Sequence, residues 1–385
     1  MSELDEILAD AVARQDAPFL VAMTGDASGV TWSGAAGERS PRQPATIDTV
    51  FRIYSMTKAV GSLAAMILID RGKLDAESTV ESILPEFGEL KLLEGFGADG
   101  PRLREPRVKA TVRHLATHTS GLVYTAFDPN IARYQQAATL PGNMSGRWKA
   151  LNYPMVFEPG ERWKYGTGID WLGLIVERID GRRIDRFCRE EIFDPLLLPD
   201  TRFEVEEHMA ARLASVKRRE ADGGFADQAF GPPSNPEFYG MGHALYSTAP
   251  DYMRFLRLFL NAGALDGVRI LSEAAIAQML SNQIGTLEIP RLTSVTPAIS
   301  ADVELFPGAP KSHSFAFMRF DGDIPGMRRA GSQGWAGILN THYWFDPAAN
   351  LAAVLMTQSL PFIEPRFAAA YERFERAVYR GLRAR

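Results

Sequence analysis

Apolar and polar positions follow two different periods along this chain. Near both ends, period-two alternation or short apolar runs predict strands over 18–24, 30–36, 49–53, 314–320, 339–345 and 351–357. Helical spacing of apolar residues predicts helices over 3–14, 59–69, 112–117, 169–178, 183–193, 251–261 and 365–385. Strand-rich ends therefore enclose a helix-rich middle.

This order of elements predicts an α/β (α+β) protein with two domains. We expect residues 1–80 and 305–385 to form one mixed α/β sandwich domain. Residues 81–304 are expected to form a mainly helical domain inserted between its two parts. The segment 285–309 is rich in glycine, proline and polar residues and is interpreted as the return linker. A cleft between two such domains is the usual place for a small-molecule site.

One of the predicted helices is apolar around its whole circumference. Residues 59–69 read AVGSLAAMILI without a charge, and a helix of this kind belongs in a protein core. It is too short to span a bilayer. Directly before it, where the strand 49–53 ends, lies Ser55-Met56-Thr57-Lys58.

The spacing within this tetrapeptide suits a nucleophile and its base. If the helix begins near Ser55, three residues of rise, roughly 4.5 Å, bring the Lys58 amine to the face of the Ser55 hydroxyl. A neutral amine can accept the serine proton, and burial favours the neutral form of an amine. A serine N-cap followed by a solvent-facing lysine would have the same residues, but a lysine at the start of so apolar a helix cannot simply point into water.

Two further segments carry residues suited to the same chemistry. Tyr165 follows a Pro-Gly turn and is followed by glycine at a helix entrance. It could reach the serine–lysine pair, or merely pack and donate one hydrogen bond. The glycine-rich run 331–338 opens a predicted strand, where bare N–H groups suit an oxyanion hole. A glycine-rich turn with a core tryptophan explains the same residues.

Composition and charge disfavour several other classes of protein. The hydrophobic fraction of 46% and the charged fraction of 23% are those of a soluble globular protein, and the net charge of −5 does not suggest a nucleic-acid groove. The acidic N-terminus does not resemble a signal peptide, and the single cysteine, Cys188, fits a reducing compartment. We therefore expect a cytoplasmic protein with neither a nucleic acid nor a membrane as its partner.

The sequence gives little support for a metal site or a cofactor site. His114 and His118 have the spacing of one helix face, but the glutamate of a zinc protease is missing between them. The sequence contains no phosphate loop, no Gly-x-Ser-x-Gly elbow, and no dinucleotide fingerprint that opens a predicted helix after a strand. No metal and no cofactor are expected, so the acid–base work falls to lysine and tyrosine.

Taken in order, these segments resemble the serine β-lactamase and penicillin-binding protein superfamily, and most closely its family VIII carboxylesterases. The matching segments are FRIYSMTKA, RGKLDAESTVESILPEF, VRHLATHTSGL, FEPGERWKYGTGIDWLGLIVE, GHALYSTAPDYMRFLRLFLNAG and GWAGILNTHYWFDP. The resemblance implies a β-lactamase/DD-peptidase-like fold, in which an antiparallel sheet flanked by helices meets a mainly helical domain with the site between them. It also implies that Ser55 is the nucleophile, Lys58 its partner base and Tyr165 the tyrosine of the second motif.

The third motif departs from the lactamase pattern, in which a strand carries Lys-Thr-Gly. The esterase-like form is Trp-Ala-Gly at 335–337, which makes the N–H groups of Ser55 and Ile338 the oxyanion donors. An ungapped alignment places Ser-Gln-Gly at 332–334 there instead and makes Trp335 the second donor. Either alignment lacks the lysine that holds a substrate carboxylate, a bond worth roughly 1.5 to 3 kcal/mol. This absence favours substrates without a carboxylate.

We therefore predict a serine carboxylesterase that works through an acyl-enzyme on a small-molecule ester with a short acyl chain. Ser55 attacks the carbonyl, Lys58 accepts the proton directly or through the Tyr165 phenol, and Tyr165 protonates the leaving alkoxide. The residues expected to contact the substrate are Trp335, Gly337, Tyr124 and Tyr239. Acyl transfer to an alcohol, weak β-lactamase activity and a sensor that is acylated without turnover are compatible with the same residues, and the oligomeric state is left undetermined.

Overall fold

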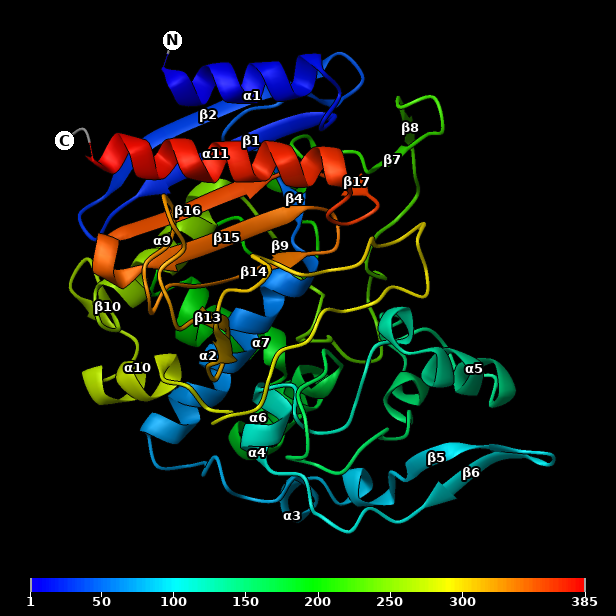
Figure 1. The fold of residues 1–385 in the computed structure, drawn as a ribbon. Helices are drawn as coiled ribbons and strands as arrows, with labels where there is room; N and C mark the ends of the chain where they lie inside the picture. Colours follow the sequence, from blue (N-terminus) through cyan, green and yellow to red (C-terminus); the bar gives the residue numbers. More distant parts are fainter. Residues whose placement is uncertain (1, 384–385) are drawn as a thin grey trace.

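The computed structural model describes residues 2–383, which form a large antiparallel sheet with helices on both faces (Figure 1). Eight strands follow the order β12-β13-β14-β15-β16-β1-β2-β3, and each neighbouring pair is antiparallel. The strands are β1 (Phe19–Gly25), β2 (Val30–Ser40), β3 (Gln43–Pro44), β12 (Lys311–His313), β13 (Met318–Phe320), β14 (Gln333–Gly337), β15 (Thr341–Asp346) and β16 (Leu351–Met356). Because β16 pairs with β1, one sheet joins the two ends of the chain.

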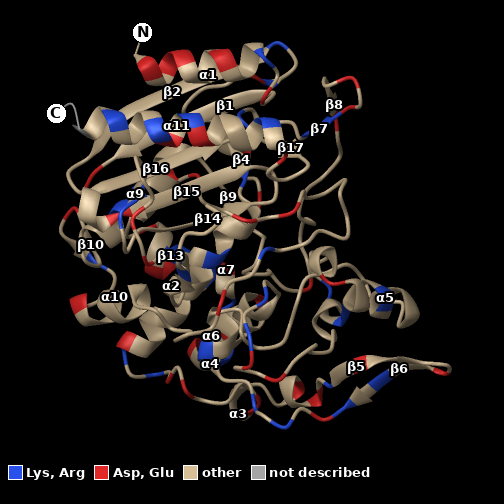
Figure 2. Cartoon of the chain, viewed as in Figure 1, with Lys and Arg blue, Asp and Glu red and all other residues tan. Residues whose placement is uncertain are grey.

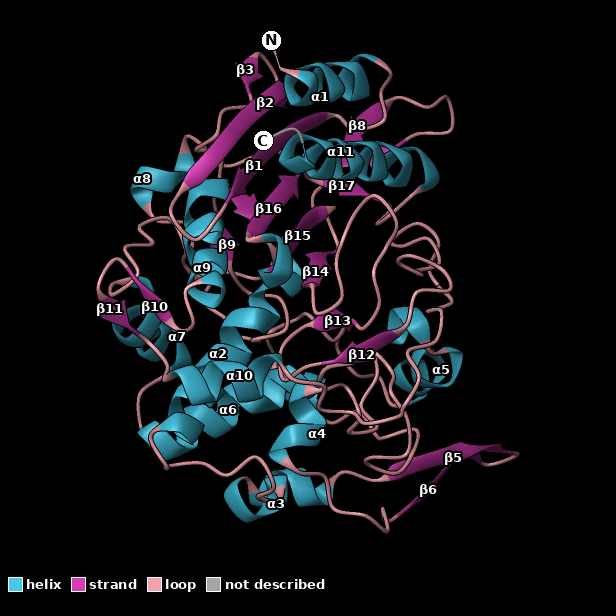
Figure 3. Cartoon of the chain, turned by 60° about the vertical axis from the view of Figure 1, so that its left-hand side comes forward, coloured by secondary structure: helices cyan, strands magenta, loops and turns pink. Residues whose placement is uncertain are grey.

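The central strands are apolar on both sides because each face of the sheet packs against helices (Figure 3). In β1, Leu20 and Ala22 share a core with α1 (Glu3–Ala13) and α11 (Pro365–Arg383). The alternate residues Phe19, Val21 and Met23 belong to the core that contains α2 (Thr57–Asp70) and α9 (Ala249–Leu260). Burial on both faces explains why these strands read as continuous apolar runs instead of alternating.

The buried helix α2 organises the helical part of the molecule. Both α6 (Gly168–Asp180) and α10 (Glu273–Leu280) pack against it, and α4 (Val112–Ala116) packs against α6. The shorter helices are α3 (Val80–Ile83), α5 (Pro129–Ala137), α7 (Ile184–Cys188) and α8 (Glu207–Ala210). The remaining strands form small sheets: β4 (Phe51–Arg52) with β9 (Tyr246–Ser247), β5 (Leu92–Gly97) with β6 (Gly100–Arg104), β7 (Lys217–Arg219) with β8 (Phe225–Asp227) and β17 (Ser359–Leu360), and β10 (Ala264–Leu265) with β11 (Val268–Arg269).

Most predicted elements occur within one or two residues of the expected ends, with four differences. The strand predicted over 30–36 continues to Ser40 as β2. The predicted strand 314–320 is wrong, because β12 and β13 form a hairpin whose turn is closed by hydrogen bonds between Ser314 and Phe317. The predicted helix 183–193 changes after Cys188 into a π-helical turn. The last two residues of the predicted helix 365–385 lie outside the described residues. The predicted domain boundaries stay a prediction, although the large sheet does come from 19–44 and 311–356.

Charged residues lie mainly outside the central strands (Figure 2). Basic residues of α11 lie beside acidic residues of α1, where Arg373 contacts Asp10 at 3.0 Å and Arg380 contacts Glu3 at 2.5 Å. These pairs are largely exposed, so each adds at most about 1 kcal/mol to stability. Within residues 2–383, no helix combines the length and the apolar character that crossing a membrane requires.

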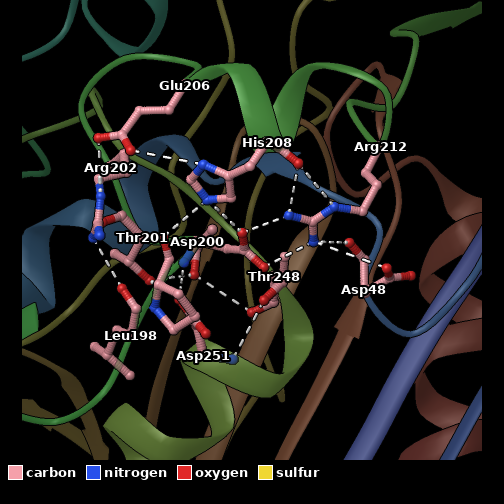
Figure 4. A network of polar contacts seen from close by, with 12 residues as sticks. Asp48, Leu198, Asp200, Thr201, Arg202, Glu206, His208, Arg212, Thr248 and Asp251 are labelled. Atoms are coloured by element: carbon pink, nitrogen blue, oxygen red, sulfur yellow. Dashed lines mark hydrogen bonds and ion pairs between the residues drawn. The ribbon is translucent and has the colours of Figure 1, made fainter.

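A polar network fastens the 198–212 segment beside α9 (Figure 4). The Arg212 guanidinium donates to the Asp200 carboxylate at 2.8 and 2.6 Å. The Asp251 carboxylate accepts from the backbone of Asp200 at 2.8 Å and from the Thr201 hydroxyl at 3.0 Å. Since β9 leads directly into α9 and pairs with β4, this network supports the strand that precedes Ser55.

Candidate active site

Ser55 lies in a tight turn between β4 and α2. The 3-10 turn Tyr54–Met56 follows the strand, and α2 begins at Thr57. Tyr54 has a φ of +42°, in a region that non-glycine residues seldom adopt. Its buried ring packs against Phe230, with 5.4 Å between the ring centroids, and this packing supports the strained conformation. The turn leaves the Ser55 side chain only partly covered while its neighbours on both sides are buried.

The Lys58 amine is enclosed by oxygen atoms and aromatic rings. It donates to Ser55 Oγ at 3.2 Å, to the Tyr124 hydroxyl at 2.9 Å and to the Gly242 carbonyl at 2.8 Å. Lys58 is only 2% exposed, and its Nζ lies about 5 Å from the ring centroids of both Tyr124 and Tyr165. The lysine therefore points into the site, as the sequence predicts.

Tyr165 contacts the other side of the same serine. Its hydroxyl donates to Ser55 Oγ at 2.6 Å and accepts from the Trp335 indole N–H at 3.2 Å. Gly166 permits this approach, because a Cβ there would lie 1.8 Å from the Leu122 carbonyl oxygen. The structure thus places both the Lys58 amine and the Tyr165 hydroxyl within hydrogen-bond distance of the Ser55 hydroxyl.

The end of β14 forms the opposite wall of the site. Trp335, Ala336 and Ile338 line the pocket that contains Ser55. Gly337 lies between them against the turn before the serine, since a Cβ there would be 2.3 Å from the Ile53 carbonyl oxygen. The competing segment 332–334 is not part of this lining: it lies at the beginning of β14, where Gln333 donates to the Leu280 carbonyl.

The pocket beside Ser55 is apolar. It contains about 410 Å³ of space between atoms, part of it open to solvent. Its lining residues are Ser55, Phe127, Tyr165, Leu292, Val303, Leu305, Trp335, Ala336, Ile338 and Phe362. No acidic or basic side chain belongs to this lining. A serine with two proton-transfer groups at the floor of such a pocket can attack the carbonyl carbon of an uncharged ester.

Comparison with known proteins agrees with this geometry. Residues 4–378 match the family model described as Beta-lactamase. The chain belongs to the beta-lactamase family. Its predicted α+β fold of the β-lactamase/DD-peptidase type is thereby confirmed, and the protein is an enzyme of this superfamily with a serine hydrolase fold.

Relatives in the beta-lactamase family include both acyltransferases and an esterase. Monacolin J acid methylbutanoyltransferase of Aspergillus terreus is 30% identical, with 96% of this chain and 93% of the relative aligned. Lovastatin esterase of Penicillium rubens is 29% identical over 92% of each chain. The unliganded structure of simvastatin synthase from Aspergillus terreus superposes with a TM-score of 0.85 at 29% identity, covering 98% of this chain and 97% of that one. The sequence-based assignment to family VIII is thus supported only at the level of the superfamily.

Within this beta-lactamase fold, the two other predicted substrate contacts lie in different places. Tyr124 accepts the hydrogen bond from Lys58, so its hydroxyl belongs to the polar centre of the site. Burial, together with the neighbouring Tyr165 and Asp170, raises the pKa of Tyr124 well above its ordinary value. The structure does not bring Tyr239 to the Ser55 pocket: its hydroxyl donates to Glu204, and its ring packs against Phe203 and Arg183.

Sequence reasoning missed a buried carboxyl group behind the lysine. Asp170 of α6 is 1% exposed and accepts from the Gly242 N–H at 2.7 Å, while the carbonyl of the same glycine accepts from Lys58. Burial raises the pKa of Asp170 to about 6, although the nearby Lys58 and the Gly242 N–H oppose this. A carboxyl group inside the apolar run GIDWLGLIV was the available signal.

Two buried histidines, His118 and His313, pack behind Tyr165 in the active site. His118 packs edge-on against Tyr165 with 4.9 Å between ring centroids, and its Nδ1 accepts from the Gly166 N–H at 3.4 Å. His313 packs against His118 at 5.2 Å. Burial lowers the pKa of His118 well below its ordinary value and that of His313 to about 4. Both rings are therefore neutral near pH 7 and serve as packing and hydrogen-bonding groups.

Proposed function

We propose that this protein cleaves carboxylic esters through an acyl-enzyme on Ser55. The observation that carries the proposal is that Ser55 Oγ lies 3.2 Å from the Lys58 amine and 2.6 Å from the Tyr165 hydroxyl, at one end of an uncharged pocket. These distances allow proton transfer to either group. The proposal assigns catalytic roles to Ser55, Lys58 and Tyr165.

The proton path follows from the three contacts. Ser55 Oγ bonds to the carbonyl carbon as its proton passes to Lys58, directly or through the Tyr165 phenol. When the bond to the leaving oxygen breaks, Tyr165 returns a proton to that oxygen and the alcohol departs. Water then attacks the serine ester by the reverse path, releasing the acid and restoring the serine hydroxyl.

The tetrahedral intermediate needs hydrogen-bond donors for its negative oxygen. We propose the backbone N–H groups of Ser55 and Ile338, because both residues line the same pocket. Each donor of this kind is worth roughly 3 kcal/mol in the transition state. The Trp335 indole, bonded to the Tyr165 oxygen at 3.2 Å, holds the phenol at the mouth of this arrangement.

The proposed substrate is a small neutral ester with a short acyl chain. Support comes from the uncharged lining of the pocket and from the missing lysine in the third motif. A charged acyl group would lose its hydration there without gaining a partner. Assignment to the family VIII carboxylesterases, a cytoplasmic location and the absence of nucleic-acid or membrane partners remain proposals based on the sequence.

Acyl transfer is the second candidate function. The same serine ester can be attacked by an alcohol instead of water, and two of the relatives bear the names methylbutanoyltransferase and lovastatin esterase. Similarity to both kinds of enzyme supports an acyl-enzyme. It also suggests that residues other than Ser55, Lys58 and Tyr165 determine whether water or an alcohol accepts the acyl group. Weak β-lactamase activity and acylation without turnover would use the same serine.

Steady-state kinetics with p-nitrophenyl butyrate test the proposal. We expect Ser55→Ala to abolish turnover, and Lys58→Ala and Tyr165→Phe to lower kcat at least a hundredfold, because each removes a proton-transfer group. Lys73→Ala, which truncates an exposed lysine just beyond α2, is the matched control and should retain wild-type kcat.

Product analysis separates the candidate functions. Ester products formed in the presence of added butanol indicate transfer, butyrate alone indicates hydrolysis, and steady cleavage of nitrocefin indicates lactamase activity. A single burst of p-nitrophenol without further release would indicate a protein that is acylated without turnover and contradict the esterase proposal. Wild-type kcat in Lys58→Ala would overturn the role of the lysine.

A further inference from the structure

The segment 285–309, which the sequence presents as a linker, forms one wall of the Ser55 pocket. Leu292, Val303 and Leu305 all belong to the pocket lining, and the segment is drawn in yellow in Figure 1. Leu292 and Val303 are only 6% and 8% exposed. They join a small apolar core with Tyr165, Phe127 and other residues around the site.

This wall is fixed in place by hydrogen bonds along its length. Leu292 and Val303 exchange two backbone hydrogen bonds of 2.9 Å, so both side chains are held at the same level of the pocket. Beyond them, the Asp302 carboxylate pairs with Arg291 at 2.7 Å and accepts from the Ser294 N–H at 2.8 Å.

The wall is also tied to two neighbouring segments. The Val295 N–H donates to the Ala126 carbonyl at 2.9 Å, and Phe362 exchanges hydrogen bonds with the backbone of Ile299 and Ala301. Ala126 precedes Phe127 in the chain, and both Phe127 and Phe362 line the pocket. The wall and its two supports therefore enclose one space next to the nucleophile.

We infer that the acyl group of the Ser55 ester lies against this wall, and that Leu292 and Val303 set the longest neutral acyl chain that the site accepts. The inference rests on the proposed function and adds the side chains that limit the length of the acyl chain. The reaction forms the bond from Ser55 Oγ to the acyl carbon and breaks the bond from that carbon to the leaving oxygen, whose alcohol carries away the serine proton. The acyl group stays behind in the enzyme and must fit a space bounded by uncharged side chains.

The two side chains limit chain length because the backbone pairing fixes their Cα positions and the apolar cluster around them leaves little space to move into. Each methylene that finds apolar contact raises kcat/KM roughly fourfold. A methylene that reaches the wall adds no apolar contact or clashes with it, so kcat/KM stops rising or falls. A carboxylate at the end of the acyl chain would lose its hydration without finding a partner.

The experiment measures kcat/KM for p-nitrophenyl esters from acetate to decanoate, together with p-nitrophenyl hemisuccinate. Intact mass of the acylated protein is recorded in parallel, so that acylation is seen even where release is slow. We expect Leu292→Ala and Val303→Ala to move the preferred chain at least two carbons longer and to raise the octanoate-to-acetate ratio about tenfold. The opposite variant, Val303→Phe, should shift the preference toward acetate, and hemisuccinate should be poor throughout.

Val295→Ala is the matched control, because Val295 lies on the same segment, is 38% exposed and is not part of the pocket lining. Its chain-length profile should equal that of the wild type. An unchanged order of esters in the wall variants, or an equal shift in Val295→Ala, would overturn the inference while leaving the esterase proposal intact. If no ester acylates Ser55 in the wild-type protein, the proposed function itself fails.

Discussion

The Tyr124 hydroxyl takes one of the three acceptor positions around the Lys58 amine. The sequence indicates an aromatic side chain near the cleft but not which atom would face the lysine, because a bond between residues 58 and 124 depends on tertiary structure. Ser55 and Lys58 could be proposed because one tetrapeptide pairs residue type with spacing, and Tyr165 because its segment resembles the second motif of the superfamily. Asp170 left only the signal of a carboxyl group in an apolar run, and neither it nor His118 belongs to a motif that names its partner.

The two tyrosines that the sequence places near the substrate give a matched pair of variants. Tyr124→Phe removes the 2.9 Å hydrogen bond to Lys58, and we expect kcat to fall about ten- to a hundredfold, the range for a bond of roughly 1.5 to 3 kcal/mol. Tyr239→Phe removes only the bond to Glu204 outside the pocket and should leave kcat and KM unchanged. Steady-state kinetics of both variants on one ester provide the measurement, and equal losses in the two would refute the distinction.

At the scale of elements, the loop 164–166 and the loop 118–124 are paired through their backbones. The Tyr124 N–H donates to the Tyr165 carbonyl at 3.3 Å, and the Lys164 N–H donates to the His118 carbonyl at 3.0 Å. The sequence predicts an open backbone at Gly166 but not its reason, which is the Leu122 carbonyl lying directly against the glycine. Elements with a strong period were predictable, whereas the hairpin β12–β13 was not, because the Ser314 side chain closes its turn.

Gly166→Ala should therefore displace Tyr165 from Ser55. A Cβ at 1.8 Å from a backbone oxygen forces the two loops apart, and we expect a loss of roughly 2 kcal/mol in unfolding free energy with at least a tenfold lower kcat. Gly29→Ala is the control, since a Cβ there meets no atom within 4 Å. Thermal unfolding and ester hydrolysis are measured on both. Wild-type kcat in Gly166→Ala would show that the loop position does not control the tyrosine.

At the scale of the whole molecule, the sheet was predictable from strands at both ends of the chain, but the burial of the histidines was not. Burial lowers the pKa of His243 and of His342 to about 3, and that of His313 to about 4. Burial raises the pKa of Asp170 and of Asp251 to about 6. Such burial depends on distant strands and helices meeting around each side chain, which a local pattern cannot reveal.

These shifts predict a protein that loses stability in mild acid. A histidine with a lowered folded pKa binds its proton in the unfolded state first, so each of the three removes roughly 2 kcal/mol of unfolding free energy between pH 6.5 and 4.5. The two aspartates have raised folded pKa values, so the folded state takes up their protons first. Each therefore adds roughly 2 kcal/mol of unfolding free energy as the pH falls over the same range. Urea unfolding should therefore show that the unfolding free energy decreases from pH 6.5 to 4.5. A constant or rising value would contradict this prediction.

His342→Gln should flatten that decrease, because the ring is buried between Phe362, Phe367 and Tyr371, away from the site. Phe367→Leu in the same cluster is the control. It should lower stability by a similar amount at every pH and leave the slope unchanged. If the unfolding free energy of His342→Gln falls with pH as steeply as that of the wild type, other groups cause the acid sensitivity.

The pairing of β1 with β16 has a consequence for synthesis on the ribosome. Val21 and Met356 are partners in the middle of the sheet, so the hairpin β1–β2 must wait for almost the whole chain to be translated. Until then, the β1 edge that β16 covers stays unpaired and α11 is missing from the face it shares with α1, which favours association with chaperones or with other nascent chains. Premature stop codons before β16 should accordingly yield aggregated or degraded polypeptide instead of a shortened enzyme.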